Sequence, residues 1–364
     1  MKDSIKKQAW IQNAYSDSLL ILLPPFFCVA IVFLFPNTFQ NSARGMQDAW
    51  WVILVLLIDV AHVYSTLYRT YFDPMARLQF RSKFVLVPFL AFVGSVLLYS
   101  AGSMLFWRVL AYIAVFHFIR QQYGFMRVYQ RKQQQPKWER FVDACTIYGS
   151  TLFPILYWHF VGDRTFSWFV AGDFITIHAP RFILSFFSYV YVLLLVFYCL
   201  KEIRNFVLNR WLNIPAVTIV GGTAISWYIG IVYLNADMSF TLLNVVSHGI
   251  PYMALIWMYG KKRVQQGDRT GKLLPIAFAK WGWIVFLGII FLLAFIEEGL
   301  WDIAVWKEHQ AVFGWLPIHF QLPEIVYGLV VPLLVTPQLT HYLLDGFIWR
   351  VKKDDLKWSD NANH

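Results

Sequence analysis

The chain is poor in charged residues for its length. Aspartate, glutamate, lysine and arginine make up only 14% of its 364 residues, whereas a soluble domain contains roughly 25%. Hydrophobic residues reach 58%, and the mean hydropathy is +0.51. This composition excludes an ordinary soluble protein and indicates that lipid is the solvent for most of the chain.

Cysteine is also scarce. The three cysteines, Cys28, Cys145 and Cys199, each lie in an apolar stretch. This pattern excludes a disulfide framework and a thiolate metal cluster. The sequence has no internal repeat, no low-complexity segment and no stretch typical of a soluble domain. We therefore expect residues 1–364 to form a single integral membrane domain.

Long apolar runs, in contrast, are abundant. An α-helix needs about 20 apolar residues to cross the hydrocarbon core of a bilayer. Such stretches are found near residues 18–36, 49–69, 84–100, 104–127, 141–161, 180–201, 212–235, 238–259, 274–297 and 324–350. The sequence therefore predicts an all-α, polytopic transmembrane helical bundle of about ten spans.

The distribution of the basic residues supports this count. If the N-terminus is cytoplasmic and the spans alternate, 24 of the 31 Lys and Arg residues fall on the cytoplasmic side, four on the outer side and three within spans. Basic residues are typically enriched in cytoplasmic loops, so both termini are predicted to be cytoplasmic. The net charge of +10 is then explained by orientation and by anionic membrane lipid, without a nucleic-acid partner. The predicted location is an integral, multi-pass one, in the inner (cytoplasmic) membrane if the protein is bacterial.

Four of the nine histidines lie at membrane depth. His62, His117, His248 and His341 fall in the second, fourth, eighth and tenth predicted spans, all of which run from outside to inside. Ionisable residues within spans are costly and usually mark function. Helical bundles commonly build metal sites from the inward side chains of several helices. We predict that these four imidazoles bind one metal ion; the alternative is four separate histidines that each pack through an interhelical hydrogen bond.

Polar residues accompany each of these histidines on its own helix face. Residues three or four apart share a face, and the four faces hold, in chain order, Asp59, Thr66 and Arg69; Arg120, Gln121 and Gly124; Thr241, Asn244 and Tyr252; Gln338 and Asp345. Metal-binding histidines usually donate their second N–H to a carboxylate, a carbonyl or water. Asp59 and Asp345 are therefore predicted to orient the histidines or to act as additional ligands.

Three of these polar residues are candidates for catalytic side chains. They are Arg120, Gln121 and Tyr252, each on a face with one of the histidines. For Arg120 an ion pair that fixes helix packing is an equally good interpretation. Neutral imidazole suits iron, zinc, copper and nickel, and we take Fe(2+) as the preferred metal, with Zn or haem b as alternatives.

Short segments around the histidines resemble the Brp/Blh family of membrane-embedded β-carotene 15,15'-dioxygenases. The segments are Asp59-Val-Ala-His62, Phe116-His117-Phe118, Val246-Ser247-His248-Gly249 and Thr340-His341-Tyr342-Leu343-Leu344-Asp345. The resemblance implies an all-helical enzyme that holds non-haem iron through intramembrane histidines and cleaves a lipophilic polyene with dioxygen. It also implies that the four membrane-depth histidines are the iron ligands.

Three functions are compatible with this pattern. The first is a metal-dependent oxidoreductase, an oxygenase by class, that acts on a lipophilic small molecule such as a carotenoid, isoprenoid or lipid. Aromatic residues make up 19% of the chain, and they would serve either as walls for such a substrate or as membrane-interface anchors. The second is a haem b protein for transmembrane electron transfer, with bis-His ligation. The third is a proton- or ion-coupled transporter, in which proline breaks would shape the pathway.

Overall fold

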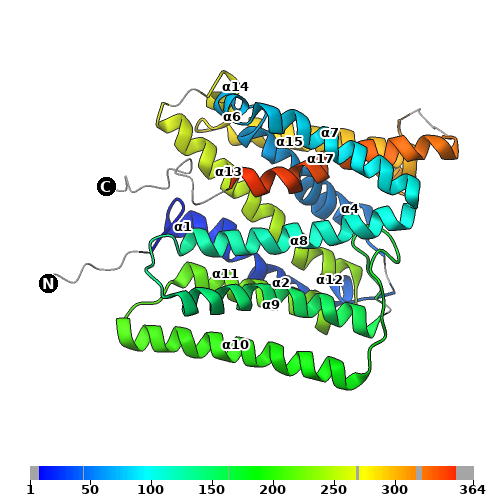
Figure 1. The fold of residues 1–364 in the computed structure, drawn as a ribbon. Coiled ribbons are helices and arrows are strands. Elements are labelled where there is room, and N and C mark those ends of the chain that lie inside the picture. The colour runs from blue at the N-terminus through cyan, green and yellow to red at the C-terminus, as the bar shows by residue number, and fades with distance from the viewer. Residues whose placement is uncertain (1–7, 44, 163, 268–269, 317–321, 350–364) are drawn as a thin grey trace. The chain divides into compact units, whose positions relative to one another are not determined.

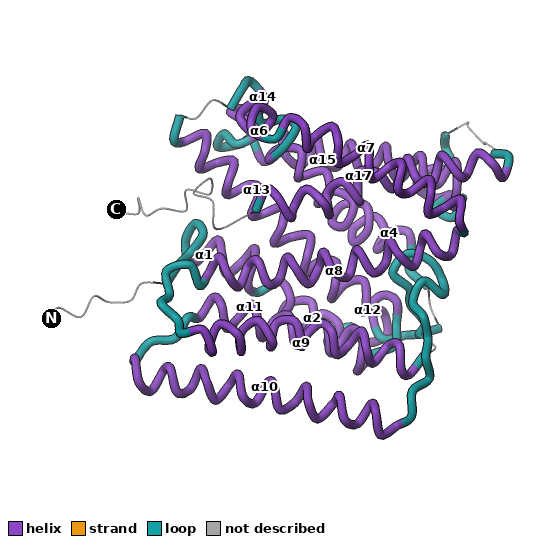
Figure 2. Tube along the Cα trace, in the orientation of Figure 1, coloured by secondary structure: helices purple, strands orange, loops and turns teal. Residues whose placement is uncertain are grey.

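A computed structural model describes residues 8–43, 45–162, 164–267, 270–316 and 322–349. Within these ranges all regular secondary structure is helical and no strand is found (Figure 2). The predicted all-helical class is therefore confirmed for the described part of the chain. Several residues used in the sequence analysis lie outside it, namely the basic residues before 8 and after 349, Arg44, Arg269, His319 and His364.

Eight of the described helices are long and apolar enough to cross a membrane. They are Asp48–Arg69, Arg81–Ala101, Ser103–Tyr129, Arg181–Asn209, Ile214–Tyr233, Asp237–Gln265, Trp283–Trp306 and Glu324–Ile348. Each has 20 to 29 residues, which at 1.5 Å per residue covers a hydrocarbon core of about 30 Å. This set is compatible with an integral membrane protein.

The two remaining predicted spans take other forms. The segment 18–36 becomes two helical pieces, Ala14–Leu22 and Pro24–Leu34, which meet at 51° and would add a ninth span if they cross together. Pro24 and Pro25 cause this break, because proline cannot continue the preceding helical hydrogen bonds. The segment 141–161 lies in α9 (Lys137–Val161), a 25-residue helix whose polar residues keep it outside the apolar set. Among the described residues, eight helices, or nine with the bent pair, are thus long and apolar enough to span a membrane, where the sequence suggested about ten.

The predicted span 274–297 begins later than expected. Its first residues form the short helix α14 (Leu273–Ala277), and the long helix α15 starts only at Trp283 and ends at Trp301. At Gly282 an added Cβ would lie 2.3 Å from the carbonyl oxygen of Ile276, so the turn between α14 and α15 requires glycine. Lys280, expected inside the span, is therefore exposed in this turn.

The chain divides into two compact units. Of the described residues, the first unit comprises 8–43, 45, 115–162 and 164–248, and the second comprises 46–114, 249–267, 270–316 and 322–349. Two of the divisions fall inside continuous helices, α8 (Ser103–Tyr129) and α13 (Ser247–Gln265). Each unit is therefore built from segments that are distant in sequence.

In the first unit, α9 packs against α10 (Arg181–Asn209) and α11 (Ile214–Trp227), and α11 packs against α2 (Pro24–Leu34), as Figure 1 shows in green and blue. Polar contacts also join α9 to α10 inside this packing. The ammonium group of Lys201 forms an ion pair with the carboxylate of Asp143, and both side chains are buried. Gln130 and Gln135 donate to the other oxygen of Asp143, so the buried carboxylate is well satisfied.

The second unit is organised around one long bent span. This span runs through α4 (Asp48–Trp51), the π-helical segment η2 (Val52–Val60), α5 (Ala61–Ser65) and the 3₁₀ turn η3 (Thr66–Arg69). The helix α15 packs along it. The helices α7 (Arg81–Ala101) and α17 (Glu324–Ile348) pack against each other, and α17 also contacts α5. These contacts bring α5 and α17 together in one core.

Candidate metal centre

The second unit contains one pair of buried histidines. His62 on α5 and His341 on α17 are each only 1% exposed. One ring nitrogen of His62 lies within 4.8 Å of one ring nitrogen of His341. Their ring centroids are 5.0 Å apart and their planes are nearly perpendicular. The sequence alone could not pair these two side chains, because they are 279 positions apart in the chain.

A chain of hydrogen bonds holds His341 in one orientation. Thr66 Oγ1 lies 2.7 Å from His341 Nδ1 and 3.0 Å from the hydroxyl of Tyr252. The Tyr252 hydroxyl in turn donates to Asp345 Oδ1 at 2.6 Å, and Trp349 Nε1 donates to the same hydroxyl at 3.4 Å. The tyrosine proton is thus directed at the carboxylate, so the tyrosine oxygen is the acceptor in its other hydrogen bonds.

The direction of these hydrogen bonds assigns the tautomer of His341. Because the Tyr252 oxygen accepts, the Thr66 hydroxyl donates to it, and the Thr66 oxygen must then accept from His341 Nδ1–H. A neutral imidazole protonated at Nδ1 has its lone pair on Nε2. The Nε2 atom of His341 therefore carries the lone pair that could bind a metal. The Nδ1–H group donates to a fixed partner, as is usual for metal-binding histidines.

The two predicted carboxylates contact the histidines of this unit less directly than expected. Asp59 Oδ1 is 3.7 Å from His62 Nδ1, and Asp345 Oδ1 is 3.8 Å from His341 Nδ1. Both distances exceed a normal hydrogen bond. Asp345 acts on His341 through Tyr252 and Thr66 instead. Arg69, on the same predicted face, interacts with Asp73 at the end of the span.

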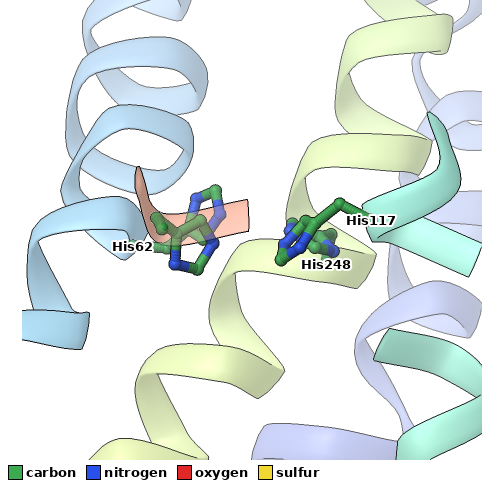
Figure 3. Close-up of side chains that lie close together, drawn as sticks. His62, His117 and His248 are labelled. Carbon is green, nitrogen blue, oxygen red and sulfur yellow. The ribbon is translucent and has the colours of Figure 1, made fainter. Parts of the chain in front are cut away.

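The first unit contains the second pair of buried histidines. His117 on α8 and His248 on α13 are 5% and 1% exposed, and Figure 3 shows their rings beside each other. The ring centroids are 5.1 Å apart with an interplanar angle of 77°, and one nitrogen of each ring lies within 4.8 Å of the other. Phe118 stacks on the His248 ring at 3.6 Å. This contact covers one face of the imidazole and fixes its plane.

Two glutamines of α8 support the helix turn that carries His248. Gln121 Nε2 donates to the carbonyl of His248 at 2.8 Å, and Gln122 Nε2 donates to the carbonyl of Ser247 at 3.2 Å. In an α-helix the Ser247 carbonyl would accept from residue 251, but Pro251 has no N–H. The side chain of Gln122 replaces that missing donor. Gln121, predicted as catalytic, is thus bonded to the backbone of a predicted ligand.

Gln122 and Phe118 are two residues of this unit whose roles were not predicted from the sequence. A signal for Gln122 was present, because a proline four residues after Ser247 leaves a carbonyl that needs a partner. The identity of that partner depends on how α8 packs, which the sequence does not show. Phe118 follows His117 in the sequence, and nothing in the sequence indicates that its ring stacks on His248.

Arg120 is directed away from the histidine pair of its unit. Its side chain is exposed and donates to the hydroxyl of Tyr148 on α9 at 2.8 Å, and it also lies over the ring of Tyr123. The structure therefore does not bring this predicted catalytic residue to the imidazoles of its own unit. The contact with α9 fits the alternative interpretation, a residue that fixes helix packing.

Two other predicted polar residues, and two histidines outside the four proposed ligands, have local partners. Asn244 donates to the carbonyl of Phe240, and Gln338 donates to the hydroxyl of Tyr342. His309 binds Asp48 and stacks on Trp51, and His159 bonds the carbonyl of Ile175. These contacts explain the residues as parts of helix and loop packing.

Models of known protein families, curated proteins and solved structures were each compared with this chain, and none of them matches it. The two histidine pairs and the residues that orient them are therefore the features of this chain that bear on its function.

Proposed function

We propose that His62, His117, His248 and His341 bind one transition-metal ion, with iron(II) preferred, in a membrane-embedded oxidoreductase that acts on a lipophilic substrate. The observation that carries this proposal is that each unit holds two buried imidazoles with ring nitrogens within 4.8 Å of each other. Two nitrogens that bind one ion at about 2.1 Å are themselves roughly 3 to 4 Å apart. The upper limit of 4.8 Å for the nitrogens of each pair lies just above that spacing.

The proposal that both pairs share one ion is supported by the chain itself. His248 is directly bonded to Gly249, the first residue of a segment of the second unit, and His117 follows Ala114, the end of another such segment, by three residues. Both connections lie inside continuous helices. In addition, the four predicted spans run in the same direction, with each histidine in its middle-to-cytoplasmic part. Two separate two-histidine sites are the competing interpretation.

The oxidoreductase class follows from the donor set that we propose. Four imidazoles provide no negative charge and leave coordination positions open on a six-coordinate metal. When bound, iron would supply one-electron chemistry with dioxygen. The residues of this chain would orient the ligands through Thr66 and Tyr252, hold α13 through Gln121, and exclude water with apolar helices. The resemblance to membrane β-carotene dioxygenases favours a carotenoid, isoprenoid or lipid as substrate.

The proposal includes the predicted topology. About ten spans, both termini in the cytoplasm and residence in the inner membrane of a bacterium would put all four histidines on the cytoplasmic half of the bilayer. The strong excess of basic residues in the predicted cytoplasmic segments supports this orientation. Cysteine labelling in intact cells would test the two sides. A single cysteine at Lys280, near the predicted cytoplasmic start of the span 274–297, should be protected from an impermeant reagent, and one at Lys307, after the predicted outer end of that span, should react.

Metal analysis of the purified protein tests the site. We expect about one equivalent of metal per chain after reconstitution with iron(II), and a loss of most of it in each of the four single His→Gln variants. His309→Gln is the matched control, because His309 contacts Asp48 rather than another histidine. Two equivalents, with each variant losing only one, would support separate sites. A metal content below about a tenth of an equivalent, or an intense absorption band near 400 nm from haem, would refute the proposal.

A further inference from the structure

Arg69 ends the bent span of the second unit and is almost completely buried, with 3% of its surface exposed. Its guanidinium makes only long contacts. Nη1 lies 4.0 Å from Asp73 Oδ2, Nη2 lies 3.5 Å from the carbonyl oxygen of Ile348, and Nε has no hydrogen-bond partner among the described residues. A guanidinium has five N–H donors, and charged hydrogen bonds are usually 2.7–2.9 Å long. This cation is therefore poorly satisfied for a buried group.

The nearest carboxylate is already used by other groups. Asp73 is fully buried, and its Oδ2 atom pairs with the guanidinium of Arg263. Its Oδ1 atom accepts from the backbone N–H of Met75 and so caps helix α6 (Pro74–Gln79). One carboxylate thus faces two guanidinium groups. Asp73 therefore does not give the Arg69 guanidinium the short, charged hydrogen bonds that a buried arginine usually makes.

Aromatic rings hold the Arg69 guanidinium in position. Its Cζ atom lies 4.3 Å from the ring centroid of Tyr259 and 5.9 Å from that of Trp349. Stacking of this kind orients the flat face of the group and leaves its N–H edge for an acceptor. Arg263 also lies near the Tyr259 ring, at 5.9 Å. The two arginines therefore share one aromatic support and one acidic partner.

We propose that Arg69 and Arg263 bind the phosphate of an anionic lipid headgroup. Arginine forks bind phosphate oxygens in a bidentate manner, and Arg69 ends a spanning helix, where headgroups are expected. The phosphate supplies the short, negatively charged acceptors that the Arg69 guanidinium lacks. This site is independent of the metal proposal, because none of its residues is a predicted ligand. The same chemistry would also accept free phosphate, and the experiment separates the two sources.

The test measures the thermal unfolding midpoint of the metal-free, full-length protein in mixed micelles. Phosphatidylglycerol, phosphatidylcholine and inorganic phosphate are added in turn at equal ionic strength. We expect phosphatidylglycerol to raise the midpoint by several degrees more than phosphatidylcholine. A lipid site requires that inorganic phosphate give a much smaller rise. If inorganic phosphate reproduces the full rise, or if the two lipids act alike, the lipid proposal is wrong.

Variants assign the effect to the two arginines. Arg69→Met should remove the preference for phosphatidylglycerol, and Arg69→Lys, which keeps the charge but loses the fork, should weaken apparent lipid affinity about tenfold. Lys83→Met is the control, because Lys83 is basic and in the same unit but contacts Phe347 and Phe80 instead. If Arg69→Met does not fold, Arg263→Met provides the same comparison. An unchanged lipid preference in the arginine variants would overturn the assignment.

Discussion

The hydroxyl of Thr66 accepts a hydrogen bond from His341 Nδ1 at 2.7 Å, from a helix that is far away in sequence. Thr66 lies one turn after His62 in the same span. Its hydroxyl therefore orients His341 from the span that carries His62. This arrangement links the two helices and assigns the Nδ1-protonated tautomer to His341. The first two predictions concern this hydroxyl and the tyrosine next to it.

Replacing Thr66 with valine should weaken metal binding without unfolding the protein. Valine has the same shape but cannot accept the N–H of His341, so the tautomer is no longer fixed. Loss of such an orienting partner typically lowers metal affinity about 10- to 100-fold. Competition titration with a chromophoric chelator measures the effect. Thr66→Ser retains the hydroxyl and should bind metal within about threefold of the unchanged protein. Equal affinities for the valine and serine variants would contradict the assigned role.

Tyr252→Phe should destabilise the fold more than an ordinary loss of one hydroxyl. The Tyr252 hydroxyl donates to Asp345 and accepts from Thr66 and Trp349, so its removal disturbs three polar partners. We expect a loss of about 1 to 3 kcal/mol in the free energy of unfolding. Tyr342→Phe, which removes a hydroxyl that accepts a hydrogen bond from Gln338, should cost about 1 kcal/mol. Similar losses in both variants would show that the chain of hydrogen bonds is not cooperative.

Gln122→Leu and Pro251→Ala should show energetic coupling. The leucine leaves the Ser247 carbonyl without the Gln122 donor and should cost about 1 to 3 kcal/mol. In the Pro251→Ala background, residue 251 regains an N–H that can bond that carbonyl, so the same leucine substitution should cost about 1 kcal/mol less. Unfolding measured in mixed micelles for the four proteins of the cycle gives this difference. Gln40→Leu, which removes a side-chain bond to the carbonyl of Val32, should combine with Pro251→Ala additively.

Asp143→Asn should strongly destabilise the first unit. The buried ammonium of Lys201 would lose one of its two carboxylate partners, Asp143, and keep only Glu202. Removing one member of a buried ion pair costs about 3 kcal/mol or more. Arg204→Met is the control, because Arg204 is 56% exposed in its pair with Glu139, and exposed pairs contribute at most about 1 kcal/mol. A larger loss for the Arg204 variant than for the Asp143 variant would contradict this ranking.

Most of the helical architecture could be predicted from the sequence, because apolar length alone identifies a helix that can span a membrane. The prediction was inaccurate where glycine and proline act locally. Gly282 permits a turn that delays α15 to Trp283, and Pro24 and Pro25 divide the first apolar run into two pieces. Neither effect changes the hydropathy of the segment, so a count of apolar residues does not detect it.

The candidate site was predictable only as a set of residues. Membrane depth and the polar residues on each helix face indicated the four histidines, but helix adjacency is not encoded in the periodicity of one helix. The pairing of His62 with His341, the position of Thr66 between His341 and Tyr252, and the support of His248 by Gln121 all depend on contacts between distant segments. Arg120 shows the converse error, since its spacing from His117 gave no indication that it turns toward Tyr148 on α9.

Two of the histidines follow directly on π-helical segments. His62 comes two residues after η2 (Val52–Val60), and His248 comes two residues after η5 (Leu242–Val246). A π-helical turn accommodates one more residue than an α-helical turn, so these stretches set the rotational phase of the helix that follows. Losing one amino acid in either stretch would turn the downstream imidazole to another side of its helix while hydropathy and length stay nearly constant. Indels in these two short regions should therefore be tolerated far less well than conservative replacements at the same positions.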